Sequence, residues 1–223
     1  MAEPAGAPRL RALLIDYGGV LTTAMGESFA EFAREHDIKA EALLDFLKAG
    51  YVEGEADDHP VSRVETGRME LEEFETHLAE ALSVGRAEPL DPAGLRDRLF
   101  AVLRPDDRML EAVRRLREAG VKVALVSNSW GPAGYPRDEL DTMFDAVLVS
   151  GEVGVRKPDR DIFLLAAERL GVEPAACVFV DDIGPNVEGA KAVGMHGIHH
   201  RTAGQTLAAL ELLFGVPLAE AGG

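Results

Sequence analysis

Residues 13–23, LLIDYGGVLTT, place an aspartate directly after an apolar run and follow it with two glycines. A short apolar run that ends so abruptly is typical of a strand buried on both faces of a sheet. Similar runs recur at 121–129, 146–150, 177–182 and, with a weaker pattern, 196–200. Between them, helices that begin at prolines and end at glycines are predicted at about 105–120, 158–171 and 185–194. This alternation predicts an α/β fold with a parallel sheet covered by helices on both faces.

The segment from residue 24 to about residue 98 departs from this alternation. It contains two amphipathic helical stretches, 28–50 and 69–82, with no strand between them, and the stretch 54–74 is expected to join helices. We therefore predict a small all-helical cap over 24–98, inserted after the first strand and placed near the carboxyl edge of the sheet. The rest divides into a frayed tail (1–9) and a core (10–23 and 99–223).

Composition narrows the class of protein. A hydrophobic content of 47% is ample for a core, and the single cysteine, Cys177, rules out an internal disulfide. No apolar run approaches the roughly 18 residues of a membrane span, and a formal net charge of -16 weakens any case for nucleic acid. We expect a cytoplasmic monomer or homodimer that binds neither membrane nor nucleic acid. A phosphorylated substrate would need local positive charge in so acidic a chain.

Polar residues stand where the predicted strands end, which is where ligands bind in parallel sheets. They are Asp16, Ser127 with Asn128, and the pair Asp181 and Asp182. Taken singly, these residues have ordinary structural explanations, such as turn capping. The adjacent aspartates are more specific because they repel one another unless a cation or hydrogen-bond donors lie between them. Hard oxygen ligands of this kind suit Mg²⁺.

Lys157 extends this set, although a lysine ahead of a helix is by itself usually solvated. In order along the chain, LLIDYGGVLT, VALVSNS, RKP and VFVDDIGPN resemble the four motifs of the haloacid dehalogenase superfamily. The resemblance spans nearly the whole chain and implies a Rossmann-like core with a helical cap between the first two motifs. The chain is similar to sugar-phosphate phosphatases of this superfamily that carry an Asp-x-Gly first motif.

The resemblance also implies roles. Asp16 would attack phosphorus to form an aspartyl-phosphate, while Ser127, with Asn128 beside it, and Lys157 would hold the phosphoryl oxygens. Mg²⁺ would be bound by Asp16, the backbone carbonyl of Gly18 and Asp182, with Asp181 and Asn186 in support. The implied activity is Mg²⁺-dependent hydrolysis of a small phosphorylated metabolite.

Position 18 departs from the family pattern, because many of its phosphatases carry there an aspartate that acts as general acid and base. General acid–base help contributes about 10² to 10⁴ in rate. Gly18 leaves three readings open: a phosphatase whose proton is handled elsewhere, a 2-haloacid dehalogenase, or a low-turnover regulatory or binding protein of the same fold. The acidic pair argues against a dehalogenase, since those members lack the metal.

Candidate substrate contacts complete the set of predicted residues. A Glu-x-Gly turn in the cap resembles one that helical caps of this family place over the active site. The candidates in the cap are Arg63, Glu65 and Arg68. Those beside the first two motifs are Tyr17 and Trp130, for which core packing is an equal alternative.

Overall fold

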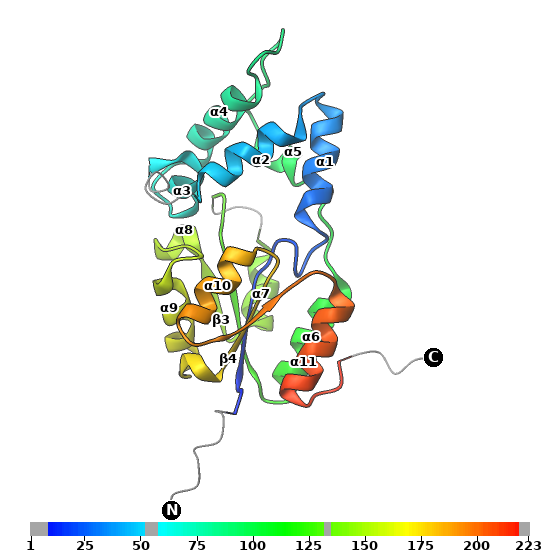
Figure 1. The fold of residues 1–223 in the computed structure, drawn as a ribbon, viewed down its shortest axis with the longest axis vertical. Helices are drawn as coiled ribbons and strands as arrows, with labels where there is room; N and C mark the ends of the chain where they lie inside the picture. The colour runs from blue at the N-terminus through cyan, green and yellow to red at the C-terminus, as the bar shows by residue number, and fades with distance from the viewer. Residues whose placement is uncertain (1–8, 52–57, 132–134, 219–223) are drawn as a thin grey trace, which may run out of the picture.

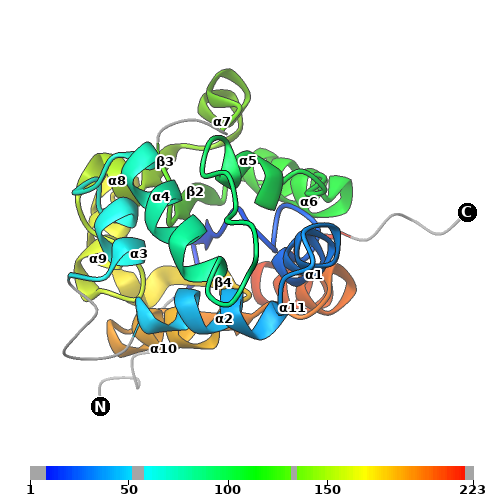
Figure 2. The same ribbon diagram turned by 90° about the horizontal axis from the view of Figure 1, so that it is seen from above.

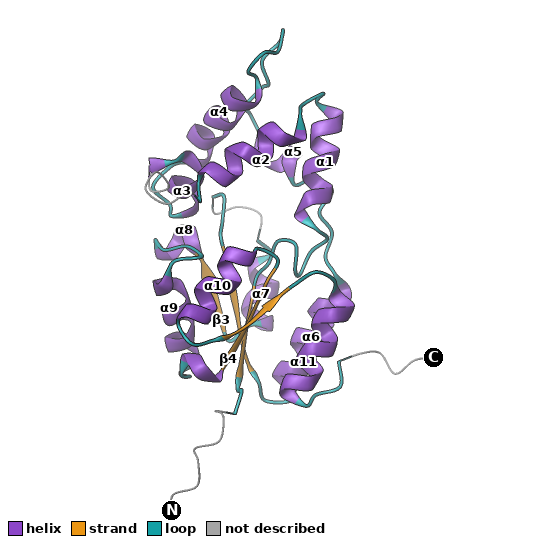
Figure 3. Ribbon diagram, in the orientation of Figure 1, coloured by secondary structure: helices purple, strands orange, loops and turns teal. Residues whose placement is uncertain are grey.

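The strand that contains the opening apolar run lies at the centre of the sheet. The computed structural model describes residues 9–51, 58–131 and 135–218. In this part of the chain, five parallel strands pair in the order β3-β2-β1-β4-β5. They are β1 (Ala12–Ile15), β2 (Lys122–Ser127), β3 (Ala146–Val149), β4 (Cys177–Asp181) and β5 (His196–His199). Figure 3 shows strands at the centre of the core, with helices on either side. The predicted α/β fold with a parallel sheet is confirmed, and the weak fifth run does form a strand.

Helices cover both faces of this sheet (Figure 1). Alternate residues of β1 point to opposite faces, so Leu13 and Ile15 join one buried cluster while Ala12 and Leu14 join the other. The first face packs against α6 (Asp107–Glu118), α7 (Arg137–Met143) and α11 (Ala203–Phe214). The second packs against α9 (Arg160–Leu170) and α10 (Gly184–Ala192). The short elements α8 (Ser150–Val153) and η2 (Pro174–Ala176) lie in the connections.

The predicted helix boundaries rest on recognisable capping. The Asp106 carboxylate accepts hydrogen bonds from the backbone N–H groups of Arg108 (3.0 Å) and Met109 (3.3 Å) at the start of α6. Helix α9 ends at Gly171, which has a φ of 66°. Glycine adopts this left-handed conformation without the steric cost of a Cβ. Both ends were therefore predictable from short sequence signals.

Five further helices gather beyond one end of the sheet, past the carboxyl ends of its strands (Figures 1 and 2). They enclose a third hydrophobic cluster, separate from the two that flank the sheet, with Phe32, Leu43, Phe74 and Leu99 among its buried members. The helices are α1 (Met25–Glu35), α2 (Ala40–Ala49), α3 (Pro60–Glu65), α4 (Leu71–Leu82) and α5 (Leu95–Leu99). We call them the cap helices. The boundaries predicted for tail, core and cap remain a prediction.

Two details of this helical region differ from the sequence prediction. The stretch 28–50 is divided into α1 and α2 by Asp37, which has a φ of 50°, a conformation that aspartate tolerates better than most residues. The joining stretch 54–74 contains a helix, α3, which begins at Pro60 after His59. Its six residues are too few to show a helical hydrophobic period.

Candidate active site

The order of the strands brings the predicted site residues together. Because β1 lies between β2 and β4, the residues that follow these strands share one edge of the sheet. Ile15 pairs with Val180, so Asp16 and Asp181 stand at the same level, and the Asp16 N–H donates to the Val180 carbonyl at 3.0 Å. The carboxylates that the sequence places 165 positions apart are thereby neighbours. This edge faces the cap helices.

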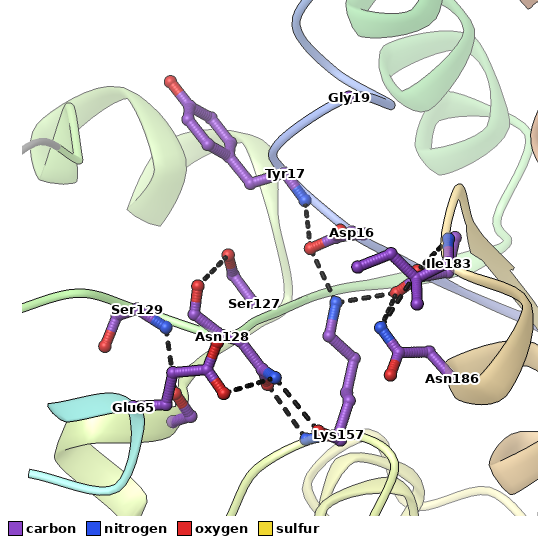
Figure 4. Close-up of polar contacts among 12 residues, drawn as sticks. Asp16, Tyr17, Gly19, Glu65, Ser127, Asn128, Ser129, Lys157, Ile183 and Asn186 are labelled. Atoms are coloured by element: carbon purple, nitrogen blue, oxygen red, sulfur yellow. Dashed lines mark hydrogen bonds and ion pairs between the residues drawn. The ribbon is translucent and has the colours of Figure 1, made fainter. Parts of the chain in front are cut away.

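Lys157 lies between two of these carboxylates (Figure 4). Its Nζ is 2.6 Å from Asp16 Oδ1 and 2.7 Å from Asp181 Oδ2, and the side chain is 1% exposed. Burial alone would lower the pKa of Lys157, but the charges of Asp16 and Asp181 outweigh it and the pKa lies above its ordinary value. Lys157 is therefore a fixed cation and not a solvated surface lysine.

The Asp16 carboxyl is held in a setting that resists its ionisation. Burial raises its pKa to about 7, and the nearby charges of Asp181 and Asp182 act in the same direction against the attraction of Lys157. Burial also raises the pKa of Asp182 to about 6, with the charge of Asp181 adding to the effect. The charge of one lysine is thus insufficient to neutralise three carboxylates, and further positive charge would favour their ionised forms.

Ligand atoms from Asp16, Asp181 and Asp182 lie within 4.8 Å of one another, close enough to share a cation. Asp181 is already bound on several sides: by Lys157, by the Ile183 N–H at 2.8 Å and by Asn186 Nδ2 at 3.0 and 3.2 Å. The carboxylates of Asp16 and Asp182 have fewer donors around them.

The other end of the Asn186 side chain also lacks a donor. Its Oδ1 is buried and has no hydrogen-bond partner among the described residues. A buried acceptor without a donor is costly, and a cation's water would supply that donor. This oxygen-rich set therefore fits Mg²⁺, and the supporting role that the resemblance implied for Asp181 and Asn186 remains a prediction.

The two glycines after Asp16 serve different purposes. Gly19 has a φ of 76°, and a Cβ there would meet Asp182 Oδ2 at 2.3 Å, so a larger residue would displace this carboxylate. A Cβ on Gly18 would meet the side chain of Met25 instead, with Sδ at 3.1 Å. Gly19 is therefore required by backbone conformation, while Gly18 leaves room that Met25 takes up.

At the end of β2, Ser127 and Asn128 have distinct surroundings. Ser127 Oγ is 2.9 Å from the hydroxyl of Tyr135, a residue that the sequence analysis did not single out. Asn128 accepts a hydrogen bond from the Lys157 N–H at 2.9 Å and donates to the Lys157 carbonyl at 3.0 Å. These two bonds fix the backbone of the lysine, which makes Asn128 a positioning residue.

A buried ion pair joins the cap helices to this edge. Glu65, at the end of α3, is 2.7 Å from Arg156 Nη1, and both side chains are almost fully buried. Glu65 also accepts hydrogen bonds from Asn128 Nδ2 (3.2 Å) and the Tyr51 hydroxyl (2.8 Å). Burial raises the pKa of Glu65, and Arg156 opposes that rise. The predicted Glu-x-Gly turn therefore touches the site through Asn128.

Sequence reasoning gave no role to Arg156, although it is the first residue of the RKP motif, and it missed Tyr51, which belongs to no motif. The other cap candidates are placed elsewhere: Arg63 donates to Glu73 at 3.3 Å, and Arg68 donates to Thr66 at 2.9 Å. Neither arginine is among the residues that line the cavity above the strand ends.

A cavity of about 620 Å³ opens above the strand ends, between the sheet and the cap helices. Asp16, Lys157 and Asp182 lie at its floor, and Tyr17 and Trp130 are among its lining residues. Its size is that of a small-molecule site. Of the predicted substrate contacts, Tyr17, Trp130 and Glu65 line this cavity, whereas most of its apolar wall residues were not singled out from the sequence.

The fold and this carboxylate-rich edge define a hydrolase with a Rossmann-like α/β core and helices over its site. The family described as haloacid dehalogenase-like hydrolase matches residues 10–194, and the chain belongs to this family. It is 31% identical over 206 residues to phosphatase MT3486 of Mycobacterium tuberculosis, across 88% of this chain and 90% of the relative. It is 29% identical to bifunctional epoxide hydrolase 2 of Sus scrofa, across 94% of this chain and 40% of the relative.

The chain spans less than half the length of several curated relatives that it matches, the epoxide hydrolase included. Among solved structures, HAD family enzyme bt-2542 of Bacteroides thetaiotaomicron was crystallised with magnesium and inorganic phosphate. It matches 90% of this chain and 98% of its own with a TM-score of 0.62 and 21% identity, which shows a shared fold. Within the described residues, no helix is both long and apolar enough to cross a membrane.

Proposed function

We propose that the protein is a Mg²⁺-dependent phosphomonoesterase that works through an aspartyl-phosphate on Asp16. The observation that carries this proposal is the buried Lys157 between Asp16 and Asp181, with Asp182 beside them. Such a cluster combines a nucleophile with fixed positive charge in an otherwise acidic chain. Phosphoryl transfer depends mainly on positioning and charge neutralisation, which this arrangement supplies. The phosphatase among its relatives and the magnesium and phosphate bound by bt-2542 support the same chemistry.

In this mechanism a carboxylate oxygen of Asp16 forms a bond to phosphorus as the bond from phosphorus to the ester oxygen breaks. The ester oxygen leaves and takes up a proton. Water then attacks phosphorus, the bond to Asp16 breaks, and inorganic phosphate leaves with Asp16 regenerated. Ser127 and Lys157 donate to the phosphoryl oxygens throughout. Asn128 keeps Lys157 in place through its two backbone hydrogen bonds.

Asp16, Asp182 and the carbonyl of Gly18 would hold Mg²⁺, with Asp181 and Asn186 behind them. When bound, the ion supplies positive charge that neutralises the phosphoryl oxygens. The proton of the leaving group has no carboxylic acid at position 18 to provide it, because that residue is a glycine. Its source is therefore a water, the substrate's own leaving group or a residue of the cap helices.

The test is phosphate release from p-nitrophenyl phosphate by the intact chain, with Mg²⁺, with EDTA, and by Asp16→Asn. We expect activity with Mg²⁺ and loss in the other two conditions. Chloride release from 2-chloropropionate, with no need for metal, would favour the dehalogenase alternative. Turnover of neither substrate by a folded protein would favour a binding or regulatory role.

A further inference from the structure

The walls of the cavity differ in character from its floor. Above the charged cluster, the cavity is lined by apolar side chains from three cap helices and two loops, among them Met25, Phe29, Leu44, Leu47, Phe100 and Trp130. The aromatic members form a continuous surface, since the ring centroids of Phe100 and Trp130 are 5.1 Å apart and those of Phe29 and Phe100 are 6.3 Å apart. A substrate held by its phosphate at the floor would meet hydrocarbon along these walls.

The mouth of the cavity extends this apolar surface to solvent. Leu44 of α2 and Ile183, which follows β4, both line the cavity and are each 40% exposed although they are large hydrophobic residues. Exposed apolar side chains that converge on a concave site favour an apolar ligand more than a structural role. The cap helices thus present hydrocarbon both inside and at the entrance.

Two arginines of the walls already have protein partners. Arg96 donates to Asp97 at 2.6 Å and to the Trp130 carbonyl at 3.1 Å. Arg104 donates to the carbonyls of Ala101 and Leu103 at 2.9 and 2.8 Å.

Two further polar side chains near the floor are engaged in the same way. Thr22 accepts a hydrogen bond from the Gly19 N–H and donates to the Thr23 carbonyl. Glu65 is occupied by Arg156, Tyr51 and Asn128. Sugar hydroxyls or a second charged group would lose hydrogen bonds with water and gain few from these walls.

We infer that the group esterified to the phosphate is a hydrocarbon chain or ring, so that the substrate is an apolar phosphate monoester and not a sugar phosphate or a nucleotide. This inference rests on the proposed phosphatase function. It also departs from the sugar-phosphate enzymes that the first motif resembles. The cavity of about 620 Å³ has room for such a group above the phosphate.

The test compares kcat/KM for butyl, hexyl and octyl phosphate with that for glucose 6-phosphate and AMP, in the presence of Mg²⁺. Each buried methylene contributes up to about fourfold in affinity, so kcat/KM is expected to rise at least about tenfold from butyl to octyl. Glucose 6-phosphate and AMP should fall below octyl phosphate. The dissociation constants of butylphosphonate and octylphosphonate, measured by calorimetry, give the same comparison without turnover.

A variant pair locates the effect in the cavity. Leu44→Gln places an amide in the wall, and it should reduce the octyl-to-butyl ratio by several-fold, whereas Leu44→Met should retain it. Leu212→Gln is the matched control, because Leu212 is 85% exposed on α11, outside the cavity lining. The control should keep the wild-type ratio.

The outcomes separate this inference from the proposed function. Activity that is equal for butyl and octyl phosphate, or higher for glucose 6-phosphate or AMP, overturns the inference and leaves the phosphatase intact. If no ester releases phosphate while octylphosphonate binds more tightly than butylphosphonate, the phosphatase proposal fails and the hydrocarbon site stands. No preference in either assay overturns the inference.

Discussion

Met25 occupies the space beside Gly18: its Sδ lies 3.1 Å from the position that a Cβ on Gly18 would take. Many phosphatases of the family that the motifs resemble carry a proton-transferring aspartate at the position of Gly18. Here α1 begins at Met25 and directs this side chain into that place. The glycine at position 18 therefore leaves the space that Met25, the first residue of the cap helices, occupies.

Gly18→Asp is expected to raise kcat, and to do so most in a Met25→Ala background, where the new side chain has room. General acid–base help is typically about 10² to 10⁴ in rate, so a gain of about tenfold is a modest expectation in the double variant. Phosphate release from octyl phosphate, whose leaving group needs a proton, measures it. Gly18→Asn matches the aspartate in size without its acid, and should give no gain. Equal rates for the aspartate and asparagine variants would mean that the proton is handled elsewhere.

Lys157→Met should abolish activity and destabilise the protein. The substitution leaves Asp16 and Asp181 buried without the cation between them, and breaking a buried ion pair typically costs about 3–5 kcal/mol. Urea unfolding followed by circular dichroism measures the loss in Mg²⁺-free buffer. Lys122→Met, at the exposed side of β2, is the matched control and should change the free energy of unfolding by about 1 kcal/mol or less. Similar losses for both variants would contradict the stabilising role of the buried ion pairs that Lys157 makes with Asp16 and Asp181.

The sequence revealed the floor of the site better than its walls. Asp16, Ser127 and Asp181 were predictable because each ends an apolar run, and parallel strands bring such ends to one edge. The four ordered motifs then added Lys157 and its neighbours. These signals are local, so no long-range contact had to be known in advance.

Contacts between the cap helices and the core were not predictable in this way. Glu65 and Arg156 are separated by 91 positions and meet because α3 packs against α8, the short helix that follows β3. Tyr135 reaches Ser127 from a loop without periodicity or motif. The apolar walls were hidden for another reason: residues such as Phe29 and Leu47 follow the ordinary spacing of an amphipathic helix, and core packing explains that spacing equally well.

Binding of Mg²⁺ should become tighter as the pH rises from 5 to 8. Without the metal, burial raises the pKa of Asp16 to about 7 and that of Asp182 to about 6, so protons compete with the ion below these values. Binding must therefore release protons, and the release should diminish above pH 7. Calorimetry in buffers of different ionisation enthalpy measures both quantities. Asp182→Asn should abolish binding, and Asp161→Asn, on the exposed face of α9, should not affect it. Affinity independent of pH would argue against these carboxyls as ligands.

The ion pair between Glu65 and Arg156 should hold the cap helices over the site. Arg156→Met leaves the Glu65 carboxylate buried without its cation, and the expected loss is about 3–5 kcal/mol in the free energy of unfolding. Glu65→Gln with Arg156→Met should lose less than the sum of the single variants, because the neutral pair leaves no charge buried. Urea unfolding of the four proteins measures this coupling.

The matched control for that cycle is the ion pair between Arg63 and Glu73, which lies on the exposed side of the cap helices with side chains 34% and 49% exposed. Arg63→Met should cost about 1 kcal/mol or less, since solvent screens such pairs. A second readout separates stability from positioning. Because Glu65 touches Asn128, and Asn128 fixes Lys157, Glu65→Gln should lower kcat for octyl phosphate at temperatures where the variant remains folded. An unchanged kcat together with lost stability would restrict Glu65 to a structural role.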